Sequence, residues 1–113
     1  MAAIANLTVD QGTSFTSDVT VKDANGNAFD LTGYTAVAKM AKGFASTRTR
    51  TTITTTVAAD ATTGIVTLSL SSTASAALDA ERYVYDLEIT QTSSGTVTRV
   101  IEGIISVRPQ VTT

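Results

Sequence analysis

The 113-residue sequence contains no cysteine, no histidine and no tryptophan. Without cysteine the chain forms no disulfide and offers no thiolate to a metal or a substrate. Without histidine it lacks the side chain that most often transfers protons near neutral pH and binds transition metals. Ser-His-Asp and Cys-His catalysis are therefore excluded, and the many Ser and Thr hydroxyls have no visible activating base. We expect neither an enzyme nor a bound cofactor.

Charged residues are also scarce: they make up 16% of the sequence, and the net charge is −2. Such a weak charge provides no attraction to nucleic acid or to an anionic lipid surface, so neither is an expected partner. No apolar run is long enough to cross a bilayer. The N-terminus carries no Lys or Arg ahead of its short apolar run, which is unlike a signal peptide. We therefore expect synthesis in the cytoplasm and no contact with a membrane.

Hydrophobic residues make up 42% of the sequence and stand beside abundant Thr and Ser. Thr is β-branched and favours the half-exposed positions of a sheet. A surface covered mainly by uncharged hydroxyls suits a subunit that packs against copies of itself or other partners, because free monomers usually carry more charge. The alternative is a β-protein that simply has a Thr-rich surface, and composition does not distinguish the two.

Alternating apolar and polar residues predict β-strands along most of the chain. In residues 13–22, for example, Phe15, Val19 and Val21 alternate with polar side chains. The further strands are expected over residues 2–7, 35–42, 47–57, 64–70, 82–90 and 96–107. About seven short strands, with turn signals about 8–12 residues apart, predict an all-β sandwich. We expect it to form a single domain over residues 1–113.

Three local features refine this prediction. Asn25-Gly26 is a pair that favours a tight hairpin turn. One short helical turn is expected near residues 72–78, where Ser71 or Ser72 can cap it and several alanines propagate it. Tyr83 opens a late strand after a loop, the position of a tyrosine corner, whose hydroxyl returns to the backbone a few residues upstream.

Six segments, taken in order and with their spacing, resemble one family. They are residues 15–22, 23–27, 30–34, 64–70, 82–88 and 95–103. Together they are similar to the immunoglobulin-like domain of tailed-bacteriophage virion proteins, including the N-terminal domain of baseplate upper proteins. The resemblance extends from about Leu7 to Val107, and it implies an immunoglobulin-like β-sandwich. Baseplate proteins of that type continue into long receptor-attached regions, whereas this sequence ends at Thr113, which favours a small decorating protein.

The resemblance implies a non-enzymatic structural protein of a tailed-phage virion, made in the host cytoplasm. Such a protein would dock in many copies on the head, neck, tail or baseplate, with other virion proteins and copies of itself as partners. The alternative is a bacterial immunoglobulin-like adhesion or carbohydrate-binding module. The N-terminus argues against a secreted adhesin, and the absence of tryptophan argues against a sugar-binding platform.

Arg48 and Arg50 are the most suggestive exposed pair, in a stretch of threonines. On a strand over residues 47–57 both would project to one side and could dock into an acidic groove of a neighbouring subunit. The alternative is edge protection, in which charges on an outer strand discourage unwanted pairing. The two functions are compatible, because an edge strand can also pair with a partner strand.

The uncharged arm of residues 2–7 is the second docking candidate, with Ile4 and Leu7 as its large apolar side chains. We prefer the alternative interpretation, in which this arm is the first strand of the domain's own sheet.

Residues 23–27 superficially resemble the start of a calcium-binding loop, in which Asp23, Asn25 and Asp30 would supply oxygens. Calcium loops of this kind place glycine at the sixth position and a bidentate glutamate at the twelfth. Here glycine stands at the fourth position, and Tyr34 stands at the twelfth. We therefore interpret the segment as a plain hairpin turn and expect no metal, with those three residues as a weak calcium candidate.

Overall fold

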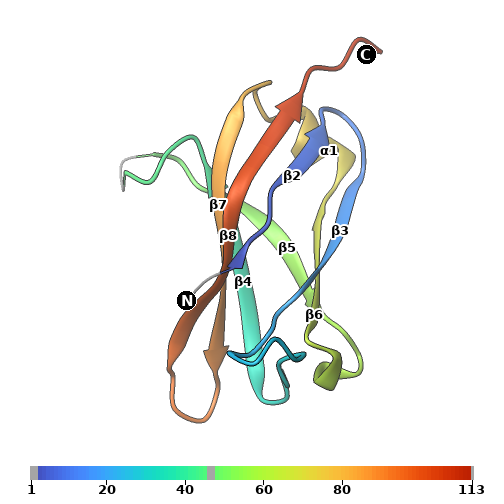
Figure 1. Ribbon diagram of the computed structural model, residues 1–113. Helices are drawn as coiled ribbons and strands as arrows, with labels where there is room; N and C mark the ends of the chain where they lie inside the picture. Colours follow the sequence, from blue (N-terminus) through green and yellow to red (C-terminus); the bar gives the residue numbers. More distant parts are fainter. Residues whose placement is uncertain (1–2, 46–47, 113) are drawn as a thin grey trace.

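The computed structural model describes residues 3–45 and 48–112, most of which lie in β-strands (Figure 1). The strands are β1 (Ala3–Ile4), β2 (Leu7–Asp10), β3 (Phe15–Thr20), β4 (Tyr34–Ala41), β5 (Thr51–Val57), β6 (Ile65–Leu70), β7 (Arg82–Gln91) and β8 (Val97–Arg108). The helical elements are a 3-10 turn, η1 (Ala61–Thr63), and a short helix, α1 (Ser72–Ala76). No helix in the described ranges has the length and apolar character needed to span a bilayer.

The strands form one curled sheet in the order β1-β8-β7-β4-β5-β6-β3, with β2 also pairing with β8. Both β1 and β2 run parallel to β8, and the other pairs are antiparallel. Because β1 and β2 share one neighbour, the eight strands occupy seven positions in the sheet. This confirms the prediction of an all-β, immunoglobulin-like sandwich of about seven strands.

Strand β5 carries the chain from one layer of the sandwich to the other. Its first residues, Thr51–Ile53, pair with β4, whereas residues 54–57 pair with β6. One layer is therefore formed by β8, β7 and β4 with the N-terminal arm, and the other by β6 and β3. Because β5 bridges the layers, the sheet continues around the core on that side.

The core lies between the two layers and contains alternate residues of each strand. In β6, for example, Val66, Leu68 and Leu70 are buried while their neighbours are partly exposed. The largest hydrophobic side chains that are almost fully buried are Val9, Val21, Leu31, Met40, Ile53, Val66, Leu68, Leu87, Ile89 and Ile105. They form one contiguous cluster. Burial of each large aliphatic side chain contributes about 1.5–3 kcal/mol, so the alternating pattern supplies the main driving force for folding.

A turn is present at Asn25-Gly26, but it is not the primed type that this pair favours, because Gly26 has a positive φ and Asn25 does not. Gly26 has φ +83°, a value that L side chains rarely adopt, and Asp23 N–H donates to the Asn27 carbonyl over 2.8 Å. The two sides of the turn are joined by an isolated bridge between Lys22 and Ala28. The turn is therefore a small surface hairpin at the end of the sandwich.

The strand predicted over residues 47–57 is shorter than expected, because β5 begins at Thr51. Residues 46 and 47 lie outside the described residues, and Arg48 to Arg50 belong to the loop before the strand. Moreover, β5 stands between β4 and β6 in the strand order and is not at an end of it. The interpretation of Arg48 and Arg50 as charges protecting a strand edge is therefore wrong.

Helix α1 and the tyrosine after it match the prediction. Ser71 caps the helix, since its hydroxyl accepts a hydrogen bond from Ala74 N–H at 3.1 Å. Leu78, just beyond the helix, is buried and joins the core at this end of the sandwich. The Tyr83 hydroxyl accepts from Asp79 N–H over 2.9 Å and lies 3.3 Å from the Asp79 carbonyl oxygen, which confirms the tyrosine corner.

Candidate docking surface

The loop between β4 and β5 is organised around the guanidinium of Arg50. This group donates to the carbonyl oxygens of Ala45, Arg48 and Phe44 at 3.1 Å, and to that of Gly43 at 3.5 Å. A guanidinium carries five N–H donors in a planar fork, so it can satisfy several carbonyls of one loop at once. In this structure Arg50 therefore shapes its own loop, and its hydrogen-bonding groups do not point away toward a partner.

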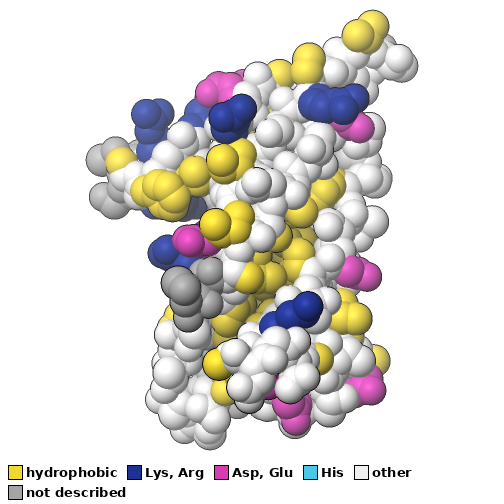
Figure 2. All heavy atoms as spheres, viewed as in Figure 1, with side chains coloured by type: hydrophobic (Ala, Val, Ile, Leu, Met, Phe, Trp, Pro, Cys, Tyr) yellow, Lys and Arg dark blue, Asp and Glu magenta, His cyan; other side chains and the backbone are white. Residues whose placement is uncertain are grey.

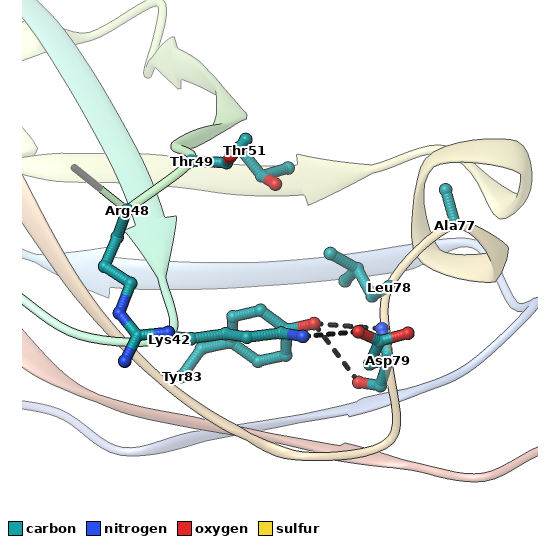
Figure 3. A pocket seen from close by; sticks show the side chains of 8 residues that line it. All are labelled: Lys42, Arg48, Thr49, Thr51, Ala77, Leu78, Asp79 and Tyr83. Atoms are coloured by element: carbon teal, nitrogen blue, oxygen red, sulfur yellow. Dashed lines mark hydrogen bonds and ion pairs between the residues drawn. The ribbon is translucent and has the colours of Figure 1, made fainter.

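Arg48 lies at a separate pocket of about 370 Å³ at one end of the sandwich (Figure 3). The residues that line this pocket are Lys42, Arg48, Thr49, Thr51, Ala77, Leu78, Asp79 and Tyr83. Among the described residues no carboxylate forms an ion pair with Arg48. Of the two arginines singled out in the sequence, Arg48 is therefore the one whose charge remains available for docking.

Lys42 reaches across the same pocket to the loop of the tyrosine corner (Figure 3). Its ammonium group forms ion pairs with Asp79 and, at 3.0 Å, with Glu81. Hydrogen bonds to Asp79 and then to Glu81 raise the pKa of Lys42 above its ordinary value. The charge of Lys42 is thus paired within the protein, where it stabilises the loop of the tyrosine corner. Arg48 is the further cation that lines the same pocket.

The N-terminal arm is a strand of the domain's own sheet, as we preferred, and lies beside β8 in Figure 1. Between β1 and β2 the side chain of Asn6 takes the place of a backbone acceptor, because its Oδ1 accepts a hydrogen bond from Ile104 N–H at 3.0 Å. Leu7 is half-buried and packs against the core. Ile4 points outward and is 74% exposed. Of the two apolar residues proposed for docking, Ile4 is the accessible one.

Ile4 lines an apolar groove on the outer face of β7 and β8. The groove measures about 380 Å³ and is lined by Ile4, Asn6, Phe44, Val84, Glu102, Gly103 and Ile104. Phe44 and Val84 also line an adjoining hollow that contains Arg50. The structure therefore brings Ile4 and the Arg50 loop to one surface, whereas Arg48 and Leu7 lie elsewhere.

Phe44 was not among the residues singled out in the sequence, although it is 69% exposed and lies in the β4–β5 loop, where it lines the groove together with Ile4 of the arm. It interrupts the strand pattern in the segment Gly43-Phe44-Ala45, where no periodicity assigns it to a buried or an exposed face. The sequence feature that could have identified Phe44 is a large aromatic residue among small ones, in the break between the strands predicted over residues 35–42 and 47–57.

The weak calcium candidates serve as turn-forming residues. Asp23 Oδ1 accepts from the backbone N–H groups of Asn25 and Asn27 at 2.9 and 3.0 Å. Asp30 Oδ1 accepts from the Thr32 hydroxyl and backbone N–H, and these bonds lower the pKa of Asp30. Within the described part of the chain, no cluster of three or more Asp, Glu, His or Cys residues is placed to hold a metal ion. The geometry is that of Asx turns.

The fold is similar to that of several solved structures. The "N-terminal domain of phage TP901-1 ORF48" matches with a TM-score of 0.56 and 11% identity, over 92% of this chain and 85% of that one. The filamin domain of Lin-41 matches with a TM-score of 0.46 and 19% identity, over 89% and 82% of the two chains. The NK cell receptor NKp44 matches with a TM-score of 0.48 and 16% identity, over 95% and 98%.

No protein-family model and no curated protein matches the sequence. At 11% identity the likeness to the phage domain is a likeness of fold.

Proposed function

We propose that the protein is a non-enzymatic structural component of a tailed-phage virion that docks in many copies on the head, neck, tail or baseplate. The observation that carries this proposal is the fold likeness to a phage domain over 92% of the chain. It agrees with the six sequence segments that, taken in order, resemble the immunoglobulin-like domain of phage virion proteins. Its partners are other virion proteins and copies of the chain itself, and its location is the virion.

The surface chemistry supports docking in preference to catalysis. Asp86, Arg99 and Glu102 lie on the outer face of β7 and β8, where Arg99 pairs with Asp86 at 3.2 Å and with Glu102 at 3.4 Å. These carboxylates are thus held in ion pairs on a strand face, unlike two carboxylates that face each other across a cleft. Apolar and weakly charged surfaces give modest contacts per copy, and the symmetry of a particle multiplies them.

Mass spectrometry of purified virions tests the proposal. We expect the protein in gradient-purified particles at a constant copy number relative to the major capsid and tail proteins. Recovery only from the soluble fraction of the lysate, with none in the particles, would overturn the virion assignment. Retention of the protein on the particles after a high-salt wash would further distinguish a structural component from a contaminant that adheres through its charge.

Arg48→Glu tests the available cation as a docking residue. Changing Arg50 would confound the test, because its guanidinium holds four carbonyl oxygens of the loop. Arg48→Glu is expected to reduce incorporation into particles while leaving the β-rich circular dichroism spectrum unchanged. Lys22→Glu is the matched control, since Lys22 lines a different pocket at the hairpin turn. Equal incorporation of both variants would remove Arg48 from the docking surface.

A further inference from the structure

We infer that the groove around Phe44 and Ile4 binds a second copy of the chain, and that Arg50 is the positioning residue that presents Phe44. The inference deepens the proposed function and rests on it, because self-association is one of the contacts that a multi-copy virion protein makes. Four observations carry it: the exposed apolar side chains, the preorganised loop, the open edge of the arm and the charge balance of the face.

The exposed apolar side chains are the first observation. Ile4 is 74% exposed and Phe44 is 69% exposed, and both line the groove together with Val84 and Ile104. Figure 2 shows hydrophobic side chains gathered on this side of the molecule, between the protruding loop at the left and the middle of the view. An exposed apolar surface that includes an aromatic residue is typical of a protein–protein interface.

The second observation is that Arg50 holds the backbone around Phe44 by hydrogen bonds. The Arg50 guanidinium accepts no hydrogen bonds and donates to the carbonyls of Gly43, Phe44, Ala45 and Arg48. These bonds fix the backbone on both sides of the aromatic ring before any partner arrives. An anchor that is already ordered loses less conformational entropy on binding, so the loop has the form of a preorganised contact.

The third observation identifies the kind of partner. The N-terminal arm, β1 with β2, has β8 as its neighbour on one side and no neighbouring strand on the other among the described residues. From Ala3 to Val9 the arm carries no charged side chain. Charged residues, which commonly discourage pairing at an edge strand, are therefore absent from this part of the arm. An open edge pairs with another extended strand, and a two-fold axis would place the same edge of a second copy against it.

The charges on the face are the fourth observation, and they favour a second copy. Ile4, Glu102, Asp86 and Lys39 lie in register across β1, β8, β7 and β4. Arg99 pairs with both acidic residues of this row, at 3.2 and 3.4 Å, and together with Lys39 it balances their two negative charges. A second copy that presents the same face brings exposed apolar side chains and balanced charges to the contact, so the face suits self-association.

Sedimentation equilibrium of the purified 113-residue chain tests the inference. The wild-type protein is expected to form a concentration-dependent dimer. Phe44→Asp and Ile4→Asp should each raise the dimer dissociation constant at least about tenfold, since a buried unpaired carboxylate costs more than 1.4 kcal/mol. Val97→Asp is the matched control: Val97 is 56% exposed at the first residue of β8 and does not line the groove, so the dimer of this variant should be unchanged.

Arg50 is tested through its coupling to Phe44. Arg50→Ala should weaken the dimer in the wild-type background, with partial rescue by Arg50→Lys. It should have no further effect in a Phe44→Ala background, because a positioning residue acts only through the side chain that it positions. An equal effect of Arg50→Ala in both backgrounds would assign Arg50 a general structural role and overturn the coupling.

The outcomes separate this inference from the proposed function. A wild-type protein that stays monomeric at all concentrations, or a dimer that survives both aspartate substitutions, overturns the second copy as occupant. If Phe44→Asp abolishes incorporation into particles while the free protein is monomeric, the groove binds another virion protein and the virion role stands. If the dimer behaves as expected but the protein is absent from virions, the interface stands and the proposed function fails.

Discussion

The hydroxyl of Tyr85 donates a hydrogen bond to the carbonyl oxygen of Ala5 over 2.6 Å, which joins two residues 80 positions apart in the sequence. Tyr85 is buried in β7, and Ala5 lies between β1 and β2. At this point the Asn6 side chain, and not a backbone carbonyl, accepts from Ile104 N–H. The carbonyl of Ala5 can therefore turn toward Tyr85, and the bond anchors the arm that carries Ile4.

Removal of this hydroxyl should loosen the arm. Tyr85→Phe is expected to lower the free energy of unfolding by about 1 kcal/mol, because the Ala5 carbonyl loses its partner while the ring stays packed. Urea denaturation followed by circular dichroism measures the change. Tyr34→Phe is the control, since no described residue forms a hydrogen bond with the Tyr34 hydroxyl and its edge-to-face contact with Phe29 remains. Equal stability of Tyr85→Phe and wild type would contradict the anchoring role.

The same residue predicts a dependence of stability on alkaline pH. Burial raises the pKa of Tyr85 to about 12, whereas in the unfolded chain the phenol titrates near its ordinary value of about 10. Between these values the unfolded state loses the proton first. The contribution of Tyr85 is therefore complete below about pH 10 and is lost as the pH rises through about 12.

Urea denaturation at increasing pH checks this expectation against Tyr85→Phe. The wild-type protein should lose stability more steeply than the variant, by up to about 1.4 kcal/mol per pH unit in this range. Parallel curves for the two proteins would show that Tyr85 titrates alike in the folded and unfolded states.

Gly103 is required for the close approach of the arm to β8. A Cβ atom at this position would lie 2.2 Å from the Ala5 carbonyl oxygen, which is backbone and cannot swing aside. Gly103→Ala should therefore lower the free energy of unfolding by about 1–3 kcal/mol and expose the arm to proteolysis. Gly43→Ala is the matched control, because its nearest contact would be an ordinary 3.7 Å to Arg48 Nε. An arm that resists protease equally in both variants would count against this constraint.

Local sequence patterns were sufficient to predict most of the strands. The alternation Val66, Leu68, Leu70 buries one face of β6 whatever its partners are, and Ser71 caps α1 through bonds within a few residues. Tyr83 could also be predicted, because the tyrosine corner closes within four residues. Each of these features depends on neighbours that are close in the sequence.

Non-local contacts explain what could not be predicted. Arg48 and Arg50 alternate with threonines as strand residues do, yet the Arg50 guanidinium finds carbonyl oxygens of a loop, and the strand begins only at Thr51. The exposed position of Phe44 follows from that loop. Likewise, the parallel pairing of the arm with β8 depends on Gly103 and Tyr85, about 80 or more residues away, and no local pattern encodes it.

In the pocket beside Arg48, the loop of the tyrosine corner is held both by a hydrogen bond to Tyr83 and by ion pairs with Lys42. Added salt distinguishes the two contributions. Tyr83→Phe removes the hydroxyl that accepts from Asp79 N–H, and we expect a loss of about 1 kcal/mol in the free energy of unfolding. Lys42→Ala removes the exposed ion pairs with Asp79 and Glu81, which counter-ions screen. Thermal unfolding with and without about 1 M salt measures both effects. Added salt should abolish the difference in stability between Lys42→Ala and wild type. The difference in stability between Tyr83→Phe and wild type should persist in salt. A salt-insensitive effect of Lys42→Ala would mean that the aliphatic stem, and not the charge of Lys42, stabilises the corner.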